Sequence, residues 1–286
     1  MRMKIVVGAL LLALAPPLGA QELTGTLKKI KDAGEIVIGH RESSVPFSYI
    51  NDQGEPEGYS IDLCMAVVDR VKEEIGADDL RVRMVPVNPQ TRIPLLANGT
   101  IDIECGSTTN NLTRQQQVDY SPITFITGTQ LLVKKDSGIE EIEDLEGKAI
   151  AVAQGTTNER AVKGTIEEKG LDVDVLNVKD HAEGFLALQT DRVDAYSTDH
   201  VLLHGLVSKA KNPDDYAVVG RFLSYDPYAL MVPRDDSAFR LVVNKTLSDL
   251  FRSGEIFTIY QKWFDGLGVP TTNLLEAAFA IQALPE

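Results

Sequence analysis

The sequence predicts an α/β protein made of two successive β-α-β units. Short β-rich apolar runs alternate with stretches whose apolar residues recur at helical spacing, first over residues 36–105. The same alternation restarts at residue 129 and continues to about residue 222. In each unit one strand is followed by a loop of small and hydroxyl residues, which begins at Gly106 in the first unit and at Gly155 in the second. This order is typical of parallel sheets with helical crossovers.

The first unit is expected to contain three strands and two helices. Ile61, Val68 and Ile75 lie at helical spacing, so residues 59–75 predict a helix that faces a sheet. The alternating run RVRMVPV and two short β-rich runs predict strands. The expected elements are strand 36–40, helix 59–75, strand 80–87, a short helix at 93–97 and strand 101–105.

The second unit repeats this order after an additional strand. Gly147 precedes one of its strands, and the Gly-Thr-Thr loop at Gly155 follows that strand. The expected elements are strand 129–134, a helical turn at 139–145, strand 149–153, helix 158–169, strand 173–178, helix 182–190, strand 193–197 and helix 201–210.

The last part of the chain is expected to return to the first unit. Strands are predicted at 216–219 and 228–232, and helices at 238–252 and 255–263. These final elements need a partner surface to bury their apolar residues, and the first unit is the simplest one.

This return makes the first lobe discontinuous. The chain then crosses twice between the lobes, near 126–130 and near 222–228, and two crossings form a hinge. The predicted lobes are residues 21–128 plus 226–286 for the first and 129–225 for the second.

The first twenty residues have the pattern of a secretory signal. Arg2 and Lys4 precede an apolar run of eleven residues, 5–15, and small residues follow up to Ala20. The run is too short to span a bilayer, so an uncleaved N-terminal anchor is the weaker alternative. No Cys follows Ala20 that would mark a lipid anchor. We therefore expect residues 1–20 to direct export of a soluble protein.

The chain is acidic, with a net charge of −14. Such a protein repels nucleic acid and anionic lipid, so a nucleic-acid function is not expected. A basic site inside it would be informative, because the overall composition works against one.

The two cysteines, Cys64 and Cys105, leave two interpretations open. Cys64 lies in the predicted helix 59–75 and Cys105 in the predicted strand 101–105. An exported pair in an oxidising compartment is a candidate disulfide. Both have apolar neighbours, so two packed free thiols are the alternative. Two cysteines without a CxxC pattern do not form a metal site, and no metal or cofactor is expected.

Polar residues gather at or just beyond the ends of the predicted strands. Arg pairs with carboxylates through its planar fork, and Asp pairs with ammonium groups. One Arg and one Asp would therefore recognise the common part of an α-amino acid, and the further Arg and His residues would supply surplus positive charge for a second carboxylate. The candidate residues are Arg41, Arg92, Ser107, Thr109, Arg114, Thr157, His181 and Asp199.

Each of these residues has a structural interpretation when it is taken singly. A strand-end Arg is often part of a surface salt bridge, and a single His is often a packed or exposed residue. Asp199 is placed to cap the helix that begins near His200. Thr156 and Thr157 are placed to cap the predicted helix 158–169. Their shared placement at equivalent strand ends favours a binding site.

Five segments of the sequence match the pattern of a known family. They are GHRESSVPFSY (39–49), TRIPLLANGTIDIECGSTTNN (91–111), QGTTN (154–158), KDH (179–181) and TD (198–199). These segments resemble the glutamate/aspartate periplasmic binding proteins of bacterial ABC transporters, and the resemblance extends over nearly the whole chain after residue 20. It implies a type II periplasmic binding fold with two lobes and a hinge, a periplasmic location, L-glutamate or L-aspartate as ligand, and an ABC transporter permease in the membrane as partner. We expect a monomer.

The resemblance also implies roles for the candidate residues. Arg114, with Thr109 and Thr157, matches the group that binds the α-carboxylate. Asp199 and Ser107 match the partners of the ammonium group. The clamp on the side-chain carboxylate corresponds to Arg41, Arg92 and His181.

Pro89 departs from the family pattern, which commonly has a Ser three residues before the equivalent of Arg92. Proline lacks both a hydroxyl and an N–H, so one donor to the ligand side chain is lost. A neutral donor contributes about 0.5–1.5 kcal/mol, enough to change the preference between aspartate and glutamate.

Two other functions compete with transport. An enzyme for a small carboxylate would use His181 and Glu104 as acid and base. Against it, Glu104 alternates to the opposite strand face from Ile103 and Cys105, and the pocket has more fixed positive charge than titratable groups. A ligand-sensing subunit would have the same binding site as a transport protein, so the sequence does not separate these two.

Overall fold

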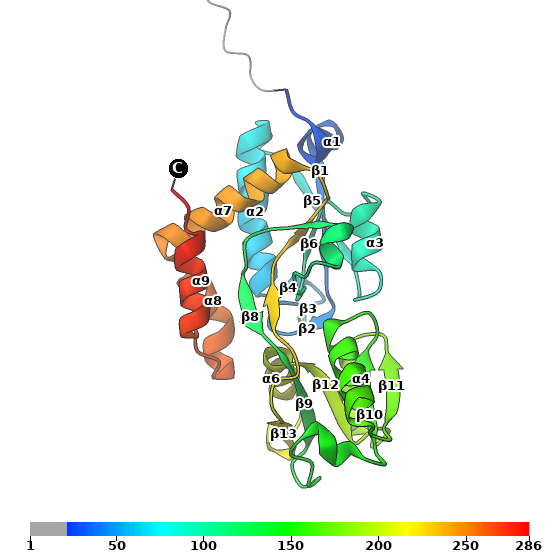
Figure 1. The fold of residues 1–286 in the computed structure, drawn as a ribbon. Coiled ribbons are helices and arrows are strands. Elements are labelled where there is room, and N and C mark those ends of the chain that lie inside the picture. The colour runs from blue at the N-terminus through cyan, green and yellow to red at the C-terminus, as the bar shows by residue number, and fades with distance from the viewer. Residues whose placement is uncertain (1–21, 286) are drawn as a thin grey trace, which may run out of the picture.

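The computed structural model describes residues 22–285 and shows two sheet-containing lobes, one above the other in Figure 1. The predicted secretory signal, residues 1–20, lies outside the described residues. No helix in the described range is both long enough and apolar enough to cross a membrane.

The first lobe is built on a five-stranded sheet with the order β5-β1-β6-β15-β7. Strand β1 pairs in parallel with β5 and with β6, as the alternation of strands and helices predicts. Strand β15 comes from the distant end of the chain and pairs antiparallel with β6 and β7. The strands are β1 (Glu35–His40), β5 (Arg81–Pro86), β6 (Ile103–Cys105), β7 (Asp119–Tyr120) and β15 (Met231–Val232).

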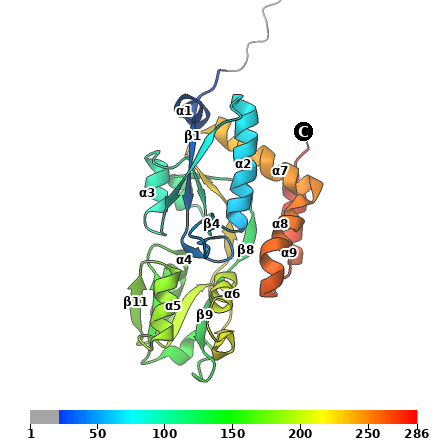
Figure 2. The same cartoon turned by 180° about the vertical axis from the view of Figure 1, so that it is seen from behind.

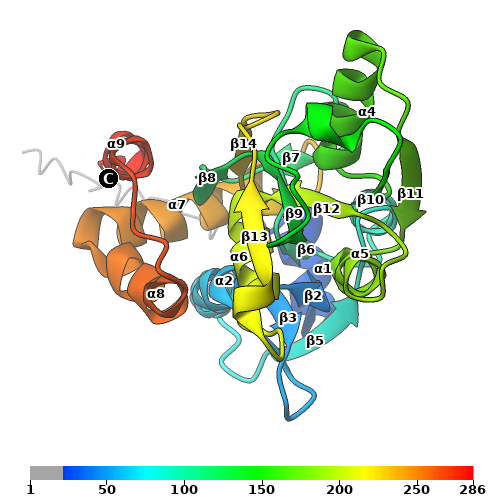
Figure 3. The ribbon, with the colours of Figure 1, turned by 90° about the horizontal axis from the view of Figure 1, so that it is seen from below.

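Helices cover both faces of this sheet. Helix α2 (Tyr59–Ile75) packs on one face and α3 (Arg92–Ala97) lies on the other (Figures 1 and 2). Helices α7 (Ser237–Ser253), α8 (Glu255–Phe264) and α9 (Asn273–Gln282) lie together on the α2 side of the molecule (Figure 3). The apolar faces of α2, α7 and α8 join one buried core.

The second lobe repeats the design with the strand order β11-β10-β12-β9-β13. Strand β10 pairs in parallel with β11 and β12, whereas β9 pairs antiparallel with β12 and β13. The strands are β9 (Thr129–Lys134), β10 (Ala149–Ala153), β11 (Asp174–Val178), β12 (Ala195–Asp199) and β13 (Tyr216–Val219). The helices are α4 (Thr157–Lys169), α5 (His181–Gln189) and α6 (His200–Ser208).

Two short strands connect the lobes. β8 (Phe125–Thr127) and β14 (Asp226–Tyr228) pair antiparallel and form a separate ribbon (Figure 1). The single strand predicted at 228–232 was wrong in extent. The chain leaves this ribbon after Tyr228 and joins the first sheet only at Met231, so the segment contributes to two different sheets.

Aromatic rings fix the ribbon in the core of the first lobe. Phe125 of β8 and Tyr228 of β14 both pack against Phe47, with ring centroids 5.0 and 5.1 Å from it. Phe264 of α8 stacks on Phe125 at 5.0 Å. Such aromatic pairs stabilise a core by more than the area that they bury.

The elements that the sequence did not predict are short or terminal. They are α1 (Gly25–Ala33), α9, strands β7 and β8, and a small three-stranded sheet of β2 (Ser43–Ser44), β3 (Ser48–Ile50) and β4 (Pro56–Glu57). Strand β6 also begins two residues later than predicted. The carboxylate of Asp102 accepts the N–H of Val37 at 2.8 Å, in place of a ladder hydrogen bond.

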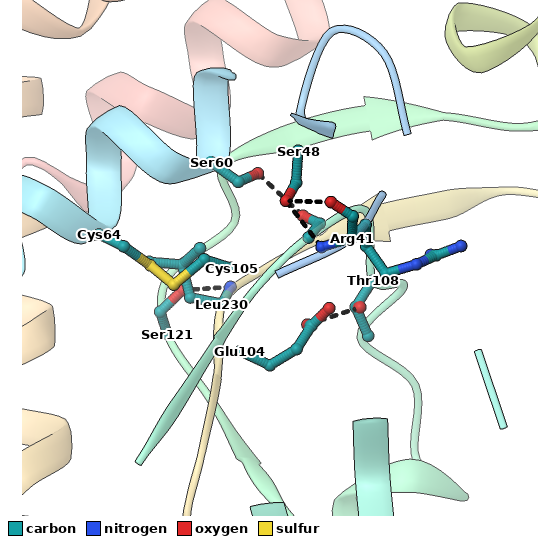
Figure 4. The surroundings of a disulfide bond; sticks show 10 residues. Arg41, Ser48, Ser60, Cys64, Glu104, Cys105, Thr108, Ser121 and Leu230 are labelled. Atoms are coloured by element: carbon teal, nitrogen blue, oxygen red, sulfur yellow. Dashed lines mark hydrogen bonds between the residues drawn. A yellow bond between two sulfur atoms is a disulfide. The ribbon is translucent and has the colours of Figure 1, made fainter. Parts of the chain in front are cut away.

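The two cysteines form a disulfide between α2 and β6, which decides between the two interpretations of the pair. The Cα atoms of Cys64 and Cys105 are 6.2 Å apart, within the range that a disulfide spans. Figure 4 shows the bond near three polar residues. Arg41 follows β1, Glu104 lies in β6, and Thr108 follows β6. The disulfide therefore fixes the strand whose end carries part of the candidate site.

Candidate ligand-binding site

The eight predicted residues lie at strand ends and helix starts on the facing edges of the two lobes. In α/β sheets the carboxyl ends of the strands are the usual ligand-binding edge. Seven of the eight side chains are buried and Thr157 is half-buried. The first lobe contributes Arg41, Arg92, Ser107, Thr109 and Arg114, and the second lobe contributes Thr157, His181 and Asp199.

Direct contacts join these two edges, so the structure shows the lobes closed on one another. The hydroxyls of Thr109 and Thr157 lie 3.2 Å apart, and Arg114 Nη2 donates to Gly155 O at 3.3 Å. At the other end of the cleft, Ala182 N donates to Ser43 Oγ at 3.3 Å.

Local capping places several of the site residues. The side chain of Asn88 accepts the N–H groups of Gln90 and Thr91, which turns the chain into α3 at Arg92. Asp180 caps α5, so His181 is the first residue of that helix. Polar side chains that accept backbone N–H groups commonly start helices in this way.

Of the three residues that the sequence suggests as helix caps, one caps its helix and the side chains of the other two point to the candidate site. Thr156 caps α4 by accepting Glu159 N at 3.0 Å, whereas the hydroxyl of Thr157 faces Thr109. Asp199 occupies the N-cap position of α6, but its side chain accepts no capping bond. The carboxylate accepts instead from Asn158 Nδ2 at 3.0 Å and from the hydroxyl of Tyr228.

Arg41 and Arg92 are buried guanidiniums with unused donors. In the described part of the chain neither forms a salt bridge, and Arg41 Nη2 and Arg92 Nε have no hydrogen-bond partner. Arg92 Nη1 donates to Ser107 O at 3.1 Å and to the hydroxyl of Thr108. Burial, followed by the charge of Arg92, lowers the pKa of Arg41 to about 10, so Arg41 keeps its charge at neutral pH.

Arg114 is also buried and charged. Its Nη1 donates to Thr109 O at 2.9 Å, which orients the guanidinium within the first lobe. Burial, followed by the charge of Arg92, lowers the pKa of Arg114 to about 10. Three guanidiniums are therefore held together in one buried region, which is costly unless an anion compensates them.

Glu104 lies next to the candidate site residue Arg92, so its place on the opposite strand face from Ile103 and Cys105 does not argue against a role there. The strand alternates as predicted, because Ile103 and Cys105 join the core beside α2. The opposite face, however, is the one on which α3 carries Arg92. Thr108 donates to Glu104 Oε2 at 2.8 Å (Figure 4). The same hydroxyl accepts from Arg92 Nη1.

Gly106 makes this arrangement possible. A Cβ at this position would lie 2.3 Å from Glu104 Oε1 and 2.8 Å from Arg41 Cγ. A side chain at residue 106 would therefore collide with the two charged residues that pack against this glycine.

His181 is neutral, so counting it as surplus positive charge was wrong. Burial lowers its pKa well below the usual 6.5, and the charges of Arg41 and Arg92 lower it further. Its Nδ1 lies 2.7 Å from the hydroxyl of Tyr196. Nε2 is the ring nitrogen left for a ligand, and it interacts as part of a neutral imidazole.

A buried polar network around Asp199 was missed by sequence reasoning. Asp226 of β14 accepts from Thr109 at 2.9 Å and from Ser224. Tyr228, on the same strand, donates to Asp199. The Asp-Pro-Tyr run was the available signal, but only the pairing of β14 with β8 brings these side chains to the site.

Gly205 of α6 tests whether closure matters for binding. Its Cβ would lie 2.1 Å from the carbonyl oxygen of Val45 in the first lobe. Alanine suits a helix better than glycine by about 1 kcal/mol, so Gly205→Ala should not weaken α6 itself. We expect the variant to bind ligand about 1–3 kcal/mol more weakly, because the lobes must move apart to admit the methyl group.

Calorimetric titration measures this effect. Gly164→Ala in α4 is the matched control, because a Cβ there meets nothing within 4 Å. An affinity of Gly205→Ala equal to that of Gly164→Ala would show that this contact is not needed for binding.

Comparison with known proteins identifies the family. Residues 36–266 match the bacterial extracellular solute-binding proteins, family 3. The chain belongs to this family. This family 3 protein is 48% identical over 260 residues to the L-glutamate/L-aspartate-binding protein of Pseudomonas aeruginosa, covering 91% of this chain and 85% of the relative. It is 42% identical over 249 residues to the glutamate/aspartate import solute-binding protein of Escherichia coli, covering 87% and 82%.

A solved structure agrees with the fold of this family 3 protein. An ancestral amino acid-binding protein, a precursor of cyclohexadienyl dehydratase, superposes with a TM-score of 0.72 at 28% identity. The match covers 84% of this chain and all of that one. The predicted type II periplasmic binding fold is confirmed by these similarities and by the two sheet-containing lobes.

Proposed function

We propose that this protein captures an acidic amino acid, L-glutamate or L-aspartate, between its lobes and delivers it to the membrane permease of an ABC importer. One observation carries the proposal. Arg41 Nη2, Arg92 Nε and Ser107 Oγ have no partner among the described residues and are buried at the edge of the first lobe that faces Asp199 of the second. The guanidiniums of Arg41 and Arg92 suit one carboxylate and that of Arg114 suits another, whereas Ser107 and Asp199 suit an ammonium, which together match an acidic amino acid. The names of the relatives support the same ligand class.

Each end of the ligand has its own partners in this proposal. Arg114, Thr109 and Thr157 bind the α-carboxylate, at the N-terminus of α4, where a helix favours anions. Asp199 and Ser107 bind the ammonium. The side-chain carboxylate lies between Arg41, Arg92 and His181.

Closure is the mechanism of capture. The ligand docks on the first lobe, which supplies three arginines, and the second lobe then closes over it. The lobes are residues 21–128 plus 226–286 and residues 129–225, and the hinge is the β8–β14 ribbon. Burying the charges is favourable only when each has its partner, so a ligand that lacks either carboxylate stabilises the closed form less.

The proposal extends to location and partners. Residues 1–20 direct export to the periplasm, and the protein acts there as a monomer. An uptake assay in cells with and without the protein distinguishes a role in transport from a role in ligand sensing. Deletion of the protein abolishes uptake of labelled glutamate if it supplies a permease, and leaves uptake intact if it reports to a receptor.

An enzyme is the alternative that one observation favours, because Glu104 lies in the site with His181. One solved neighbour is an amino acid-binding protein that is described as a precursor of a dehydratase, so an enzyme on this fold is a reasonable alternative. We propose binding without reaction, because Thr108 holds Glu104 beside Arg92 and Arg41 adds a further fixed charge there. NMR of glutamate and aspartate incubated with the protein tests this, and any new product would establish the enzyme instead.

Calorimetry of refolded, ligand-free protein tests the ligand. We expect glutamate or aspartate to bind far more tightly than glutamine, which lacks the second carboxylate. Glutarate, a dicarboxylate without the amine, should also bind weakly, because Asp199 is then unpaired. Glutarate or glutamine binding as tightly as both acidic amino acids would overturn the assignment. The same titrations measure how Pro89 affects the preference between glutamate and aspartate.

Ligand binding is expected to release a proton from Asp199. Burial, followed by the charge of Asp226, raises the pKa of Asp199 to about 8, so the ligand-free closed form is mostly protonated there at pH 7. A ligand ammonium favours the carboxylate and lowers this pKa again. Binding to the closed form should therefore strengthen as the pH increases toward 8, with release of up to one proton at pH 7.

Titrations in buffers of different ionisation enthalpy count that proton. Asp199→Asn should remove the buffer dependence as well as most of the affinity. The same observed heat in every buffer for the wild-type protein would contradict the role of Asp199.

A further inference from the structure

Two histidines of α6 form a pair that the ligand-binding site does not use. His200 and His204 lie one turn apart, on the same face of the helix. Their Nε2 atoms are 3.1 Å apart, whereas the ring centroids are 4.5 Å apart, so the rings converge through these two nitrogens. Both residues are half-buried, and the exposed ring of Phe222 packs edge-on against His200 at 5.7 Å.

The pair is in the form that metal ions bind. Burial, followed by the charge of His204, lowers the pKa of His200 to about 4, and burial lowers that of His204 as well. Both imidazoles are therefore neutral at pH 7, and a neutral imidazole nitrogen is a common metal ligand. The distance of 3.1 Å between the two Nε2 atoms also allows a hydrogen bond between the imidazoles when no metal ion is bound.

We propose that His200 and His204 bind one divalent transition-metal ion, such as Ni²⁺, Cu²⁺ or Zn²⁺, through their Nε2 atoms. At metal–nitrogen distances of about 2.0–2.1 Å, nitrogens 3.1 Å apart subtend about 100° at the metal. That angle is larger than the ligand–metal–ligand angle of square-planar or octahedral coordination and smaller than that of tetrahedral coordination. The pair therefore suits all three ions. No group of three or more His, Cys, Asp and Glu residues in residues 22–285 could hold a metal ion, so water fills the other positions.

The position of the pair gives the ion a structural effect. His200 follows Asp199 directly, and its N–H donates to Gly128 O at 2.9 Å, beside the hinge. A metal ion bound to both imidazoles joins the first and second turns of α6. It should therefore stabilise the start of the helix that carries Gly205 against the first lobe.

Titration of the tag-free protein with Ni²⁺ tests the site at neutral pH. We expect one ion per chain and a melting temperature that rises with Ni²⁺ concentration, because the ion binds only the folded pair. His200→Gln and His204→Gln should each weaken binding by at least about tenfold and remove the thermal shift. Binding that either variant retains at wild-type affinity would overturn the proposal.

Two further measurements test the site even if a single variant does not fold properly. The double variant His204→Gln/Ser208→His preserves the number of histidines but moves the second imidazole two turns from the first, and it should not restore binding. Electron paramagnetic resonance of the Cu²⁺-loaded wild-type protein should show coupling to two imidazole nitrogens. Coupling to fewer than two, or no uptake of the ion, would also reject the site.

Discussion

Replacement of Arg41 by methionine is expected to lower the affinity for glutamate by about 3–5 kcal/mol, or between about a hundredfold and a few thousandfold. The proposed role of Arg41 is to compensate the side-chain carboxylate. The loss for glutamine should be smaller, because glutamine has no charge at that end. Calorimetric titration with both ligands measures the difference.

The same substitution should not destabilise the ligand-free protein. The Arg41 guanidinium donates no hydrogen bond to any described residue and is repelled by Arg92. Methionine keeps much of its apolar volume and removes a buried charge whose desolvation outweighs its attraction to Glu104 and Asp180. The free energy of unfolding should therefore stay the same or rise while the affinity falls.

Arg92→Ala provides the contrast. Arg92 also holds Ser107 O and the hydroxyl of Thr108, so its removal should lower both stability and affinity. Arg81→Ala is the surface control, because that Arg side chain is 72% exposed. Equal losses for glutamate and glutamine in Arg41→Met would contradict the assignment of Arg41 to the side-chain carboxylate.

Removal of the disulfide in the double variant Cys64→Ala/Cys105→Ala is expected to cost about 4 kcal/mol of unfolding free energy. The two residues are 41 positions apart, so the bond restricts a sizeable loop of the unfolded chain. It also joins α2 to β6 just before Gly106. We therefore expect a weaker binding site as well as a less stable protein, because Ser107 and Thr109 follow directly.

Guanidinium unfolding of the double variant and of the wild-type protein measures the stability difference. The wild-type protein unfolded under reducing conditions should match the variant, because both lack the same covalent link. A mass increase of two protons on reduction establishes the bond in the purified protein. A loss of less than about 1 kcal/mol would show that the unfolded chain is barely restricted by the bond.

The sequence predicted where the candidate residues lie because strand ends are local features. Arg41 directly follows one short β-rich run, Asp199 ends another, and Thr157 follows a third after a short loop, while parallel strands place their ends at one edge. Helix α2 was predicted with its observed bounds, because its apolar residues keep helical spacing over 17 residues.

What the sequence did not predict depends on contacts between distant segments. The charge state of His181 follows from burial and from two arginines in the other lobe. Glu104 joins the site only because α3 packs on its side of the sheet. Tyr228 and Asp226 were missed because the strand that carries them has its partner about a hundred residues earlier in the chain.

The ribbon between the lobes also determines how the molecule can move. Phe125 and Tyr228 hold it in the first lobe, so any bend must occur where it meets the second. There a Cβ on Gly128 would lie 2.2 Å from Ser224 O, which shows that the two crossings touch. Two strands in contact bend together about one axis and resist twisting. We therefore expect the second lobe to rotate about one axis, which would expose a ligand between the lobes to solvent along a single path of opening.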